Sequence, residues 1–429
     1  MEHAHRLIAR LFPDSGAELS MGGVPVGEIA ARHGTPVFAY DRHVLDATWA
    51  RVRSAYPPSF SIAYSVKANP NAAILRHFVD RGAPLEVASA GELTRALAAG
   101  CRPEDVLFAG PGKTERELEL ALARGIGEIH VESAVEARRI SVIAERLQTR
   151  ARAALRVNPR ADAQGGAMRM GGKPAPFGVD EECMDEVIDV LVRDPRIDFR
   201  GLHLFAGTQI LDSTVLVTQC RHGVELARRV ATRLGAPLAT LDFGGGLGVP
   251  YFPQERELDL DKLREELHGL VAELEGDSRL AGTRLLIEPG RYLVAEAGVY
   301  VTRITDIKVS RGKTFYIVDG GMNHHLAASG NLGQVIKRNF PIAVVNRLAD
   351  GPTHKVDVVG PLCTPLDTLA REVTLARAEV GDLVGIFQSG AYGLTASPQG
   401  FLSHPSPAEV LAGDGRASII RARREPDAE

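Results

Sequence analysis

One lysine of this sequence lies in a setting that could make it a nucleophile. Lys67 is part of the segment AYSVKAN, whose apolar residues would partly remove its ammonium group from water. Burial lowers the pKa of a lysine because the charged form loses hydration, and the neutral amine can then attack a carbonyl carbon. An isolated lysine of this kind is more often a surface residue with a buried stem. The polar residues elsewhere in the chain therefore decide the interpretation.

Three consecutive glycines follow another apolar segment and could surround a phosphate group. Gly244, Gly245 and Gly246 lie in DFGGGLG, directly after a short apolar run. Glycine lets the backbone come close to a ligand and leaves N–H groups free to bind an anion. A tight turn between a strand and a helix would explain the same run. The run is neither the G-x-G-x-x-G of a dinucleotide site nor a P-loop.

A carboxylate and a guanidinium lie three residues apart in IEPGR. Glu288 could hold a protonated ring nitrogen, and Arg291 could pair with phosphate or with a substrate carboxylate. A structural ion pair is the alternative for both. His203 ends an apolar run, where it could stack on a cofactor or fill the core. The adjacent His324 and His325 point in different directions, which does not favour a metal site.

Two further residues near the C-terminal end could take part in chemistry. Cys363 lies in GPLCTPLD (360–367), and a thiol can return a proton to a carbanion. A small buried hydrophobic residue is the usual alternative for a free cysteine. Tyr392 lies in the glycine-flanked turn SGAYG and could reach a phosphate, although packing within a β domain would also explain it.

Eight short apolar runs predict the strands that position these residues. The runs cover residues 61–69, 85–89, 106–110, 128–133, 153–158, 201–207, 240–246 and 285–291. Between them, apolar residues recur every three or four positions, which is the spacing of amphipathic helices. Eight such units in about 230 residues match an eight-stranded β/α barrel, although an open doubly wound sheet would alternate in the same way. In a barrel, Lys67, Glu86, His203 and Glu288 would share the catalytic face.

A different pattern begins after residue 291. Segments rich in Val, Ile, Thr and Tyr, without long helices between them, predict a β domain. GTPVFAYD, near the N-terminal end, also predicts a strand that could join this domain. We therefore expect a β/α barrel over residues 45–291 and a β domain formed by residues 1–44 and 292–429.

The composition limits the choice of partners. The 429 residues carry a formal net charge of -4, which gives no basic field for nucleic acid. The apolar runs are short and interrupted by charge, so we expect neither a membrane span nor a secretory signal. The four cysteines are scattered, without a C-x-x-C pair, which favours a reducing, cytoplasmic location.

Six motifs follow one another in order: YSVKAN, HLFAGTQ, DFGGG, EPGR, GPLC and SGAYG. Together they resemble the fold-type-III pyridoxal-phosphate decarboxylases, the family of diaminopimelate, ornithine and arginine decarboxylases that is related to alanine racemase. The resemblance runs over about residues 25–415. It implies a barrel with a β domain, pyridoxal 5'-phosphate as cofactor, and a homodimer whose active sites are shared between subunits.

The resemblance also implies roles for the matching residues. Lys67 is similar to the Schiff-base lysine, Cys363 to the proton donor from the neighbouring subunit, and His203 to the histidine that stacks on the cofactor ring. The other implied cofactor contacts are Glu86, Thr208 in place of the usual serine, Gly244, Gly245, Gly246, Glu288 at the pyridine nitrogen, Gly290, Arg291 and Tyr392. The implied substrate contacts are Arg291, Thr364, Asp367 and Tyr392, and no metal is expected.

Three departures from the family pattern concern the substrate. Thr364 follows the cysteine where relatives that act on diamino acids carry an acid. DGGM (319–322) is followed by NHHLAASGNLG, without the usual arginine and tyrosine, and H-I-G-S-Q is lengthened to HLFAGTQ. A site without a counter-charge discriminates against a charged distal group. We therefore expect an amino-acid decarboxylase whose substrate has a capped or uncharged far end, such as a glutamyl unit on an acyl carrier protein.

Three alternatives remain open at this point. The first is a meso-diaminopimelate decarboxylase with unusual specificity elements. The second is an amino-acid racemase, which would need two opposed acid–base groups and would release no carbon dioxide. The third is a non-catalytic binding homologue, against which the retention of Lys67, Glu288 and Cys363 argues.

Overall fold

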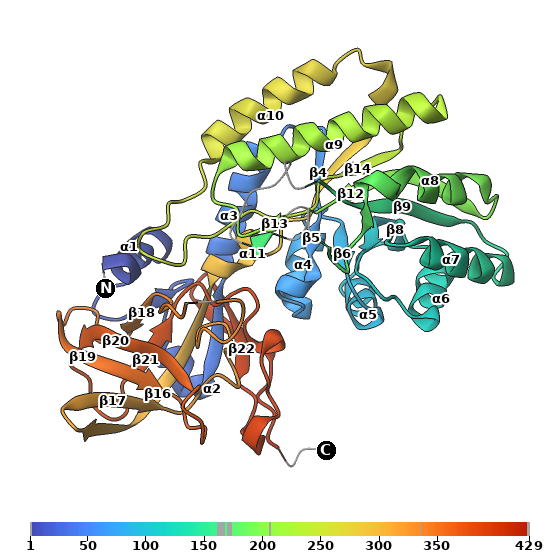
Figure 1. The fold of residues 1–429 in the computed structure, drawn as a ribbon. Helices are drawn as coiled ribbons and strands as arrows, with labels where there is room; N and C mark the ends of the chain where they lie inside the picture. The colour runs from blue at the N-terminus through green and yellow to red at the C-terminus, as the bar shows by residue number, and fades with distance from the viewer. Residues whose placement is uncertain (1, 161–167, 170–173, 206, 335, 427–429) are drawn as a thin grey trace. The chain divides into compact units, whose positions relative to one another are not determined.

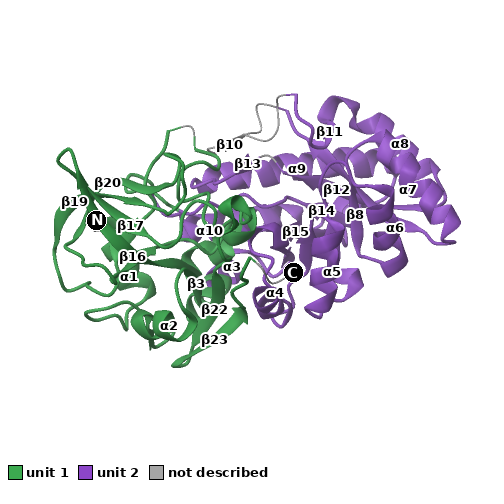
Figure 2. Cartoon of the chain, turned by 90° about the horizontal axis from the view of Figure 1, so that it is seen from below, with its two compact units in different colours: residues 1–49, 250–255, 291–429 green, residues 50–249, 256–290 purple. Residues whose placement is uncertain are grey.

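The computed structural model describes residues 2–160, 168–169, 174–205, 207–334 and 336–426. The contacts within the chain divide it into two compact units, which Figure 2 draws in different colours. Unit 1 comprises residues 1–49, 250–255 and 291–429, and unit 2 comprises residues 50–249 and 256–290. Each unit is described separately below.

Unit 2 contains a parallel sheet whose strand order returns to its starting segment. The order is β4–β15–β14–β12–β9–β8–β7–β6–β5. These strands are β4 (Phe60–Ile62), β5 (Tyr64–Ser65), β6 (Leu85–Val87), β7 (Val106–Phe108), β8 (Glu128–Val131), β9 (Ala151–Asn158), β12 (Ile197–Leu204), β14 (Thr240–Asp242) and β15 (Arg284–Ile287). Because β4 and β5 are successive parts of one segment, the first and last positions of the order meet. The expected eight-stranded barrel is confirmed, and the chain does not form the open sheet.

Helices alternate with these strands along the chain, as Figure 1 shows. They are α3 (Arg42–Ala55), α4 (Ala72–Val79), α5 (Ala90–Ala98), α6 (Glu115–Arg124), α7 (Ala134–Arg146), α8 (Met184–Arg193), α9 (Ser213–Leu234) and α10 (Leu260–Leu274). Polar side chains define where several of them begin. Ser89 accepts a hydrogen bond from the backbone of α5, and Thr114 forms a reciprocal capping box with Glu117 in α6. The strands β6, β7 and β8 are fully buried, as in a parallel sheet covered by helices.

Two short pairings accompany the barrel. β11 (Val179–Asp180) pairs with β9 in parallel, and β10 (Met168–Arg169) pairs with β13 (Gly207–Thr208) in antiparallel register. β13 follows β12 closely in the chain, so it lies just beyond the carboxyl end of a barrel strand. These pairings therefore shape the loops beyond the strand ends, where barrel enzymes carry their active sites.

Unit 1 is a β domain, as expected for the second part of the fold. Its main sheet has the order β20–β19–β17–β16–β3–β22–β23, and β21 joins β16 to β18. The strands are β3 (Val37–Asp41), β16 (Gly298–Ser310), β17 (Lys313–Val318), β18 (Ile342–Val344), β19 (Pro352–Val359), β20 (Thr368–Ala376), β21 (Leu383–Ile386), β22 (Ala408–Gly413) and β23 (Arg416–Arg421). β3 lies between β16 and β22, and all five of its residues are buried.

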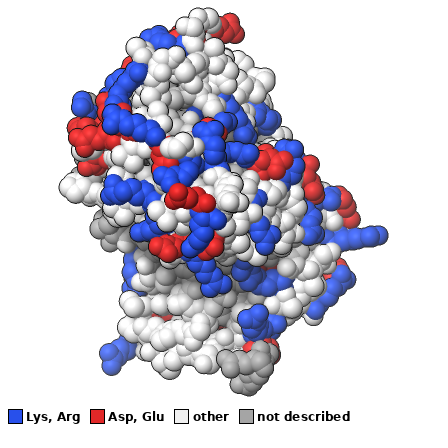
Figure 3. Space-filling view, turned by 90° about the vertical axis from the view of Figure 1, so that its right-hand side faces the viewer, with Lys and Arg blue, Asp and Glu red and all other residues white. Residues whose placement is uncertain are grey.

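The remaining regular elements of unit 1 are short. They are α1 (Glu2–Leu11), α2 (Val26–His33), α11 (Arg291–Val294) and the hairpin of β1 (Ser20–Met21) with β2 (Val24–Pro25). Within the described part of the chain, no helix has the length and apolar character to cross a bilayer. Figure 3 shows one face of the molecule, on which acidic side chains lie beside basic ones.

Candidate active site

Lys67 lies at the carboxyl end of the first barrel strand, in unit 2. It belongs to the 3-10 helix η1 (Val66–Ala68), which follows β5. Its Nζ atom lies 3.2 and 3.1 Å from the two carboxylate oxygens of Glu86 at β6, and Ser65 also donates a hydrogen bond to Glu86. Glu86 is buried, whereas the Lys67 side chain is 45% exposed. The amine is therefore more open to solvent than its apolar sequence neighbours suggested, and a buried carboxylate holds it.

The glycine turn follows β14 and leaves no space for side chains. A Cβ atom on Gly245 would lie 2.5 Å from the carbonyl oxygen of Glu288, and one on Gly244 would lie 2.4 Å from that of Leu204. Gly244 and Gly246 also have positive φ angles of 68° and 117°, which favour glycine. The Gly244 N–H donates to Asp242 Oδ1 at 2.8 Å, and the Glu288 N–H donates to the Gly244 carbonyl at 2.8 Å. The turn is thus fixed against the end of β15.

Phe205 lies between the lysine and the glycine turn. Its ring centroid is 5.9 Å from Lys67 Nζ and 5.9 Å from the guanidinium carbon of Arg156. A Cβ atom on Gly244 would lie 2.9 Å from Phe205 Cδ2. Phe205 therefore presents an aromatic ring beside the lysine, at a position to which the sequence analysis assigned no role.

His203 is buried inside the barrel, where it contacts two other polar side chains. It is 1% exposed, and its ring stacks on His130 at a centroid distance of 4.1 Å and an interplanar angle of 16°. Its Nε2 atom is in hydrogen-bonding contact with Glu288 Oε2 at 3.2 Å. Phe205 comes directly after Leu204, the last residue of β12, so it lies beyond His203 toward the carboxyl end of this strand.

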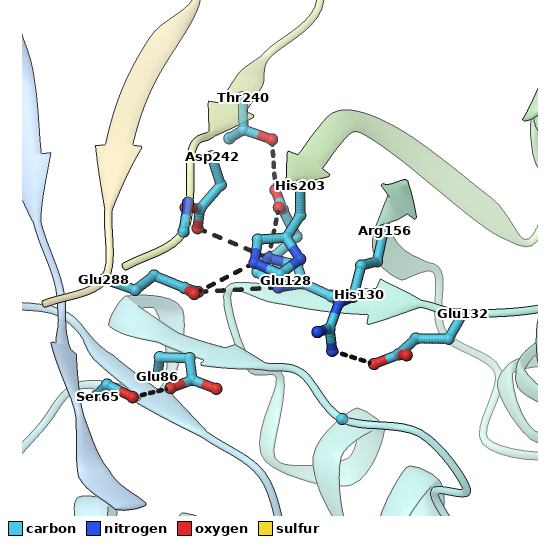
Figure 4. Close-up of polar contacts among 12 residues, drawn as sticks. Ser65, Glu86, Glu128, His130, Glu132, Arg156, His203, Thr240, Asp242 and Glu288 are labelled. Carbon is cyan, nitrogen blue, oxygen red and sulfur yellow. Dashed lines mark hydrogen bonds and ion pairs between the residues drawn. The ribbon is translucent and has the colours of Figure 1, made fainter. Parts of the chain in front are cut away.

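Four buried side chains converge inside the barrel, near the carboxyl ends of its strands, as Figure 4 shows. His130, His203, Asp242 and Glu288 each have one ring nitrogen or carboxylate oxygen that lies within 4.8 Å of those of the other three. Burial, followed by the carboxyl group of Glu288, raises the pKa of Asp242 well above its usual range. Burial, followed by the charge of His130, lowers the pKa of His203 well below its usual range. Burial thus favours the neutral form of each group.

Of the other residues predicted to contact the phosphate, two belong to unit 2 and two belong to unit 1. In unit 2, Thr208 is half-buried in β13, and a Cβ atom on Gly290 would lie 3.0 Å from the Cβ atom of Ser65. In unit 1, Arg291 donates to the Tyr251 hydroxyl at 3.2 Å, and its guanidinium carbon lies 4.6 Å from the ring centroid of Tyr392. Arg291 and Tyr392 are thus in contact within unit 1.

Residues 360–367 of unit 1 form the loop that carries Cys363, called the cysteine loop below. Some of its predicted site residues are accessible and one is buried. Cys363 is exposed and Thr364 is half-buried, so both side chains can meet a ligand. Asp367 is 2% exposed, and its carboxylate accepts hydrogen bonds from the backbone N–H groups of Met322 at 2.6 Å and Leu362 at 2.9 Å. The substrate contact predicted for Asp367 is therefore corrected, because its carboxylate holds the backbone of the loop.

Several residues of the site escaped the sequence analysis. Arg156 pairs with Glu132 at 2.8 Å and also contacts the rings of Phe205 and Phe177. His130 and Asp242 belong to the buried cluster described above. Strand alternation could have placed them inside the barrel, since His130 lies within an apolar run and Asp242 ends another. Their depth depends on the stagger between strands, which the sequence does not reveal.

A parallel barrel that carries a lysine, a glycine turn and a buried carboxylate at its strand ends defines a class of enzymes that hold a phosphate-bearing cofactor there. Residues 42–295 match the family described as pyridoxal-dependent decarboxylase, pyridoxal binding domain. The chain therefore belongs to the pyridoxal-dependent decarboxylases and is an enzyme that uses pyridoxal phosphate.

Relatives along almost the whole chain agree with this family. The L-glutamyl-[BtrI acyl-carrier protein] decarboxylase of Niallia circulans is 38% identical over 412 residues, covering 95% of this chain and 96% of that protein. A diaminopimelate decarboxylase of Methanothermobacter thermautotrophicus is 33% identical over 424 residues, covering 96% of each. The crystal structure of diaminopimelate decarboxylase from M. jannaschii with L-lysine has a TM-score of 0.88 at 25% identity, over 96% of this chain and 94% of that one.

Proposed function

We propose that this decarboxylase acts on an amino acid whose far end is capped or uncharged, and that the substrate is a glutamyl group carried by an acyl carrier protein. The observation that carries the proposal is the cysteine loop. Thr364 follows Cys363, and the acid of the loop, Asp367, is hydrogen-bonded to backbone N–H groups. This loop therefore offers no free carboxylate to a distal ammonium group. The similarity to a decarboxylase of a carrier-bound glutamyl substrate supports the same choice.

The residues of unit 2 fit the cofactor of the family. Glu288 Oε1 is buried and has no hydrogen-bond partner among the described residues, as expected of an oxygen that awaits a pyridinium N–H. The turn from Gly244 to Gly246 has no room for side chains and can bring its backbone close to a phosphate. In our proposal Lys67 holds the cofactor covalently, while Glu86 orients the amine. Thr208, Gly290, Arg291 and Tyr392 are proposed to complete the phosphate contacts.

We place the aromatic contact with the cofactor on Phe205 instead of His203. One face of the His203 ring is covered by His130, and its Nε2 atom already contacts Glu288. Phe205 lies beside both Lys67 and the glycine turn, which would hold the aldehyde carbon and the phosphate of the cofactor. His203 is thereby proposed to orient the Glu288 carboxylate from below.

The chemistry divides between the cofactor and the chain. Pyridoxal phosphate, when bound, supplies a protonated ring that accepts the electron pair left by departing carbon dioxide. Glu288 keeps the ring nitrogen protonated by accepting its N–H as a carboxylate. Arg291 is proposed to bind the substrate carboxylate or the phosphate, and Tyr392 to help hold either group. Cys363 is proposed to donate the proton that replaces carbon dioxide at the α-carbon.

We further propose that Cys363 serves the active site of a second subunit in a homodimer. Its side chain is exposed, and apolar side chains lie exposed on neighbouring loops. Leu366 is 48% exposed and Leu332 is 40% exposed, and the Asn331 amide ties the two loops together by donating to the Leu366 carbonyl at 3.1 Å. Exposed apolar residues beside a functional group are typical of an interface. A cytoplasmic location belongs to the same proposal, supported by four free cysteines.

Measuring carbon dioxide release from purified protein tests the substrate. We expect release from a glutamyl thioester of an acyl carrier protein and little release from free meso-diaminopimelate. Replacing the lysine in the variant Lys67→Ala should abolish release and also the near-visible absorbance of the bound cofactor. The variant Thr364→Asp is the matched control for specificity, since it should improve the use of a substrate with a distal ammonium group. Rapid turnover of free meso-diaminopimelate by the wild type would instead identify a diaminopimelate decarboxylase.

A further inference from the structure

A second carboxyl group lies beside Glu288 in a part of the barrel that holds several acids. Asp242 is 0% exposed and Glu288 is 5% exposed, and both belong to the group of four side chains within 4.8 Å of one another. Among the residues that the structure describes, the ion-pair contacts of these two carboxyls are to His130 and His203, with neither lysine nor arginine. Two buried carboxylates at this distance repel each other strongly, so they cannot both be ionised.

The two stacked imidazoles favour a proton over a metal ion as the shared partner. A metal ligated by histidine lies close to the plane of the imidazole ring. The His130 and His203 rings are nearly parallel and 4.1 Å apart, so one ion cannot lie in both planes. His130 instead lies among the acids, with Nε2 3.3 Å from Glu128 and 4.0 Å from Asp242, and Nδ1 3.9 Å from Glu288.

The hydrogen bonds identify which carboxyl group has room for the proton. Glu128 accepts a hydrogen bond from the Thr240 hydroxyl at 2.7 Å, so its charge is partly compensated. Asp242 accepts the Gly244 N–H with Oδ1, while its Oδ2 is buried and has no hydrogen-bond partner within the described residues. Glu288 is contacted by the His203 ring nitrogen at 3.2 Å. Glu128 Oε1 and Glu288 Oε1 are also buried without a hydrogen-bond partner among the described residues, but a histidine ring nitrogen lies 3.3 Å from Glu128 and 3.2 Å from Glu288, against 4.0 Å for Asp242. Asp242 is therefore the least compensated of the three carboxyls and the best placed to carry a proton, on Oδ2.

We propose that Asp242 and Glu288 share one proton, which resides on Asp242, so that Asp242 is a positioning residue that keeps Glu288 ionised. The inference deepens the proposed function, because Glu288 then presents its charge to the cofactor nitrogen. The raised pKa of Asp242 agrees with this assignment. The other charged groups that act on the cluster are Glu86, Glu132 and Arg156, which influence His203. The pair titrates as a unit, and neither carboxyl has an independent proton.

Infrared difference spectroscopy of the purified full-length chain at neutral pH tests the proton directly. We expect the carbonyl band of a neutral carboxyl group in the wild type, and its loss in the variant Asp242→Asn. The matched control Glu128→Gln removes a neighbouring buried acid and should retain the band. A wild type without the band, or a band that survives in Asp242→Asn and disappears in Glu288→Gln, would overturn the assignment.

Cofactor affinity provides a second readout, measured from the absorbance of pyridoxal phosphate added to the cofactor-free chain. Asparagine resembles a neutral aspartic acid and can still accept the Gly244 N–H. The variant Asp242→Asn should therefore bind within about twofold of the wild type, whereas an ionised Asp242 predicts a loss of about tenfold or more, the size of one charged contact. If Glu288→Gln fails to fold, the comparison of Asp242→Asn with Glu128→Gln still decides whether Asp242 carries the proton.

The two proposals fail in different ways. A neutral-carboxyl band at Asp242 in a chain that binds no pyridoxal phosphate would support the shared proton and overturn the proposed function. Carbon dioxide release from the carrier-bound substrate, without any neutral-carboxyl band, would overturn the shared proton alone.

Discussion

Phe205 and Phe177 both contact the guanidinium of Arg156, but Phe205 also lies beside Lys67 and the glycine turn. This difference allows a matched pair of variants. Replacing the ring in Phe205→Leu keeps an apolar side chain and removes the aromatic contact, which should weaken cofactor binding by roughly 3- to 10-fold. Phe177→Leu should leave binding within about twofold, because in our proposal only the contact with arginine is lost.

Titrating pyridoxal phosphate into each cofactor-free variant and following its absorbance measures this effect. A Phe205→Leu variant that binds as tightly as the wild type, together with a weakened His203→Gln variant, would return the stacking role to His203. For Asp367 too, the contacts of the side chain indicate a different role from the one that its residue type suggests. Its carboxylate lies in a loop that suggests substrate binding, but both of its oxygens accept backbone N–H groups.

Among the elements, the glycine turn that follows β14 is hydrogen-bonded to the end of β15 and should tolerate no side chain. In Gly245→Ala the new Cβ atom would lie 2.5 Å from the Glu288 carbonyl oxygen, so Glu288 must move. Overpacking of this kind costs about 1–3 kcal/mol. We expect cofactor affinity to fall by about tenfold or more as the Glu288 carboxylate is displaced.

Gly269→Ala is the control for this prediction, because a Cβ atom there meets nothing within 4 Å in helix α10. It should raise the free energy of unfolding by up to about 1 kcal/mol and leave cofactor affinity unchanged. Equal affinities in Gly245→Ala and the wild type would show that the turn can move away from Glu288. Denaturant unfolding and cofactor titration measure the two quantities separately.

The elements were predictable because their patterns are local. β6, β7 and β8 lie in short segments rich in apolar residues, and Ser89 and Thr114 mark where the following helices begin. Strand ends then placed Lys67, Gly244 and Glu288 on one face. Asp242 and His130 could not be assigned a role, because their contacts depend on the stagger of strands far apart in the chain. The domain boundaries expected at residues 45 and 291 stay a prediction.

At the scale of the whole molecule, shared active sites would allow two inactive variants to complement each other. Lys67→Ala removes the amine proposed to hold the cofactor, and Cys363→Ala removes the proposed proton donor. If each site takes its lysine from one subunit and its cysteine from the other, mixed dimers contain one intact site. Random reassociation should then recover about a quarter of the wild-type activity. No recovery after subunit exchange, verified by dimers carrying two different tags, would place both residues of a site in one subunit.

Two buried histidines make the stability of unit 1 dependent on pH. Burial lowers the pKa of His324 to about 4 and that of His325 to about 3. In the unfolded chain both would take up protons below their ordinary pKa of about 6.5. The unfolded state then binds more protons than the folded state, so stability falls as the pH drops from about 6.5 toward 4.

Denaturant unfolding between pH 7 and pH 4 checks this prediction. Each fully titrating histidine should contribute up to about 1.4 kcal/mol per pH unit to the loss. The variant His325→Gln should show a smaller loss, because its side chain can keep a hydrogen bond near Ser389 without binding a proton. An unfolding free energy that does not change over this range would contradict the buried, neutral state of both rings.

The position of β3 has a consequence for synthesis on the ribosome. Val37 pairs with Ala408, and Val37 also pairs with Val301 on the other side, so β3 completes its sheet with partners translated hundreds of residues later. The barrel unit between them is complete as soon as residue 290 has left the exit tunnel. Until then Phe38 and Tyr40, both buried in the finished sheet, have no native partners from β16 or β22. Nascent chains that stall before β22 is synthesised should therefore expose the apolar strand β3 while the barrel unit is already folded. Chaperones that bind exposed apolar segments should recognise such chains.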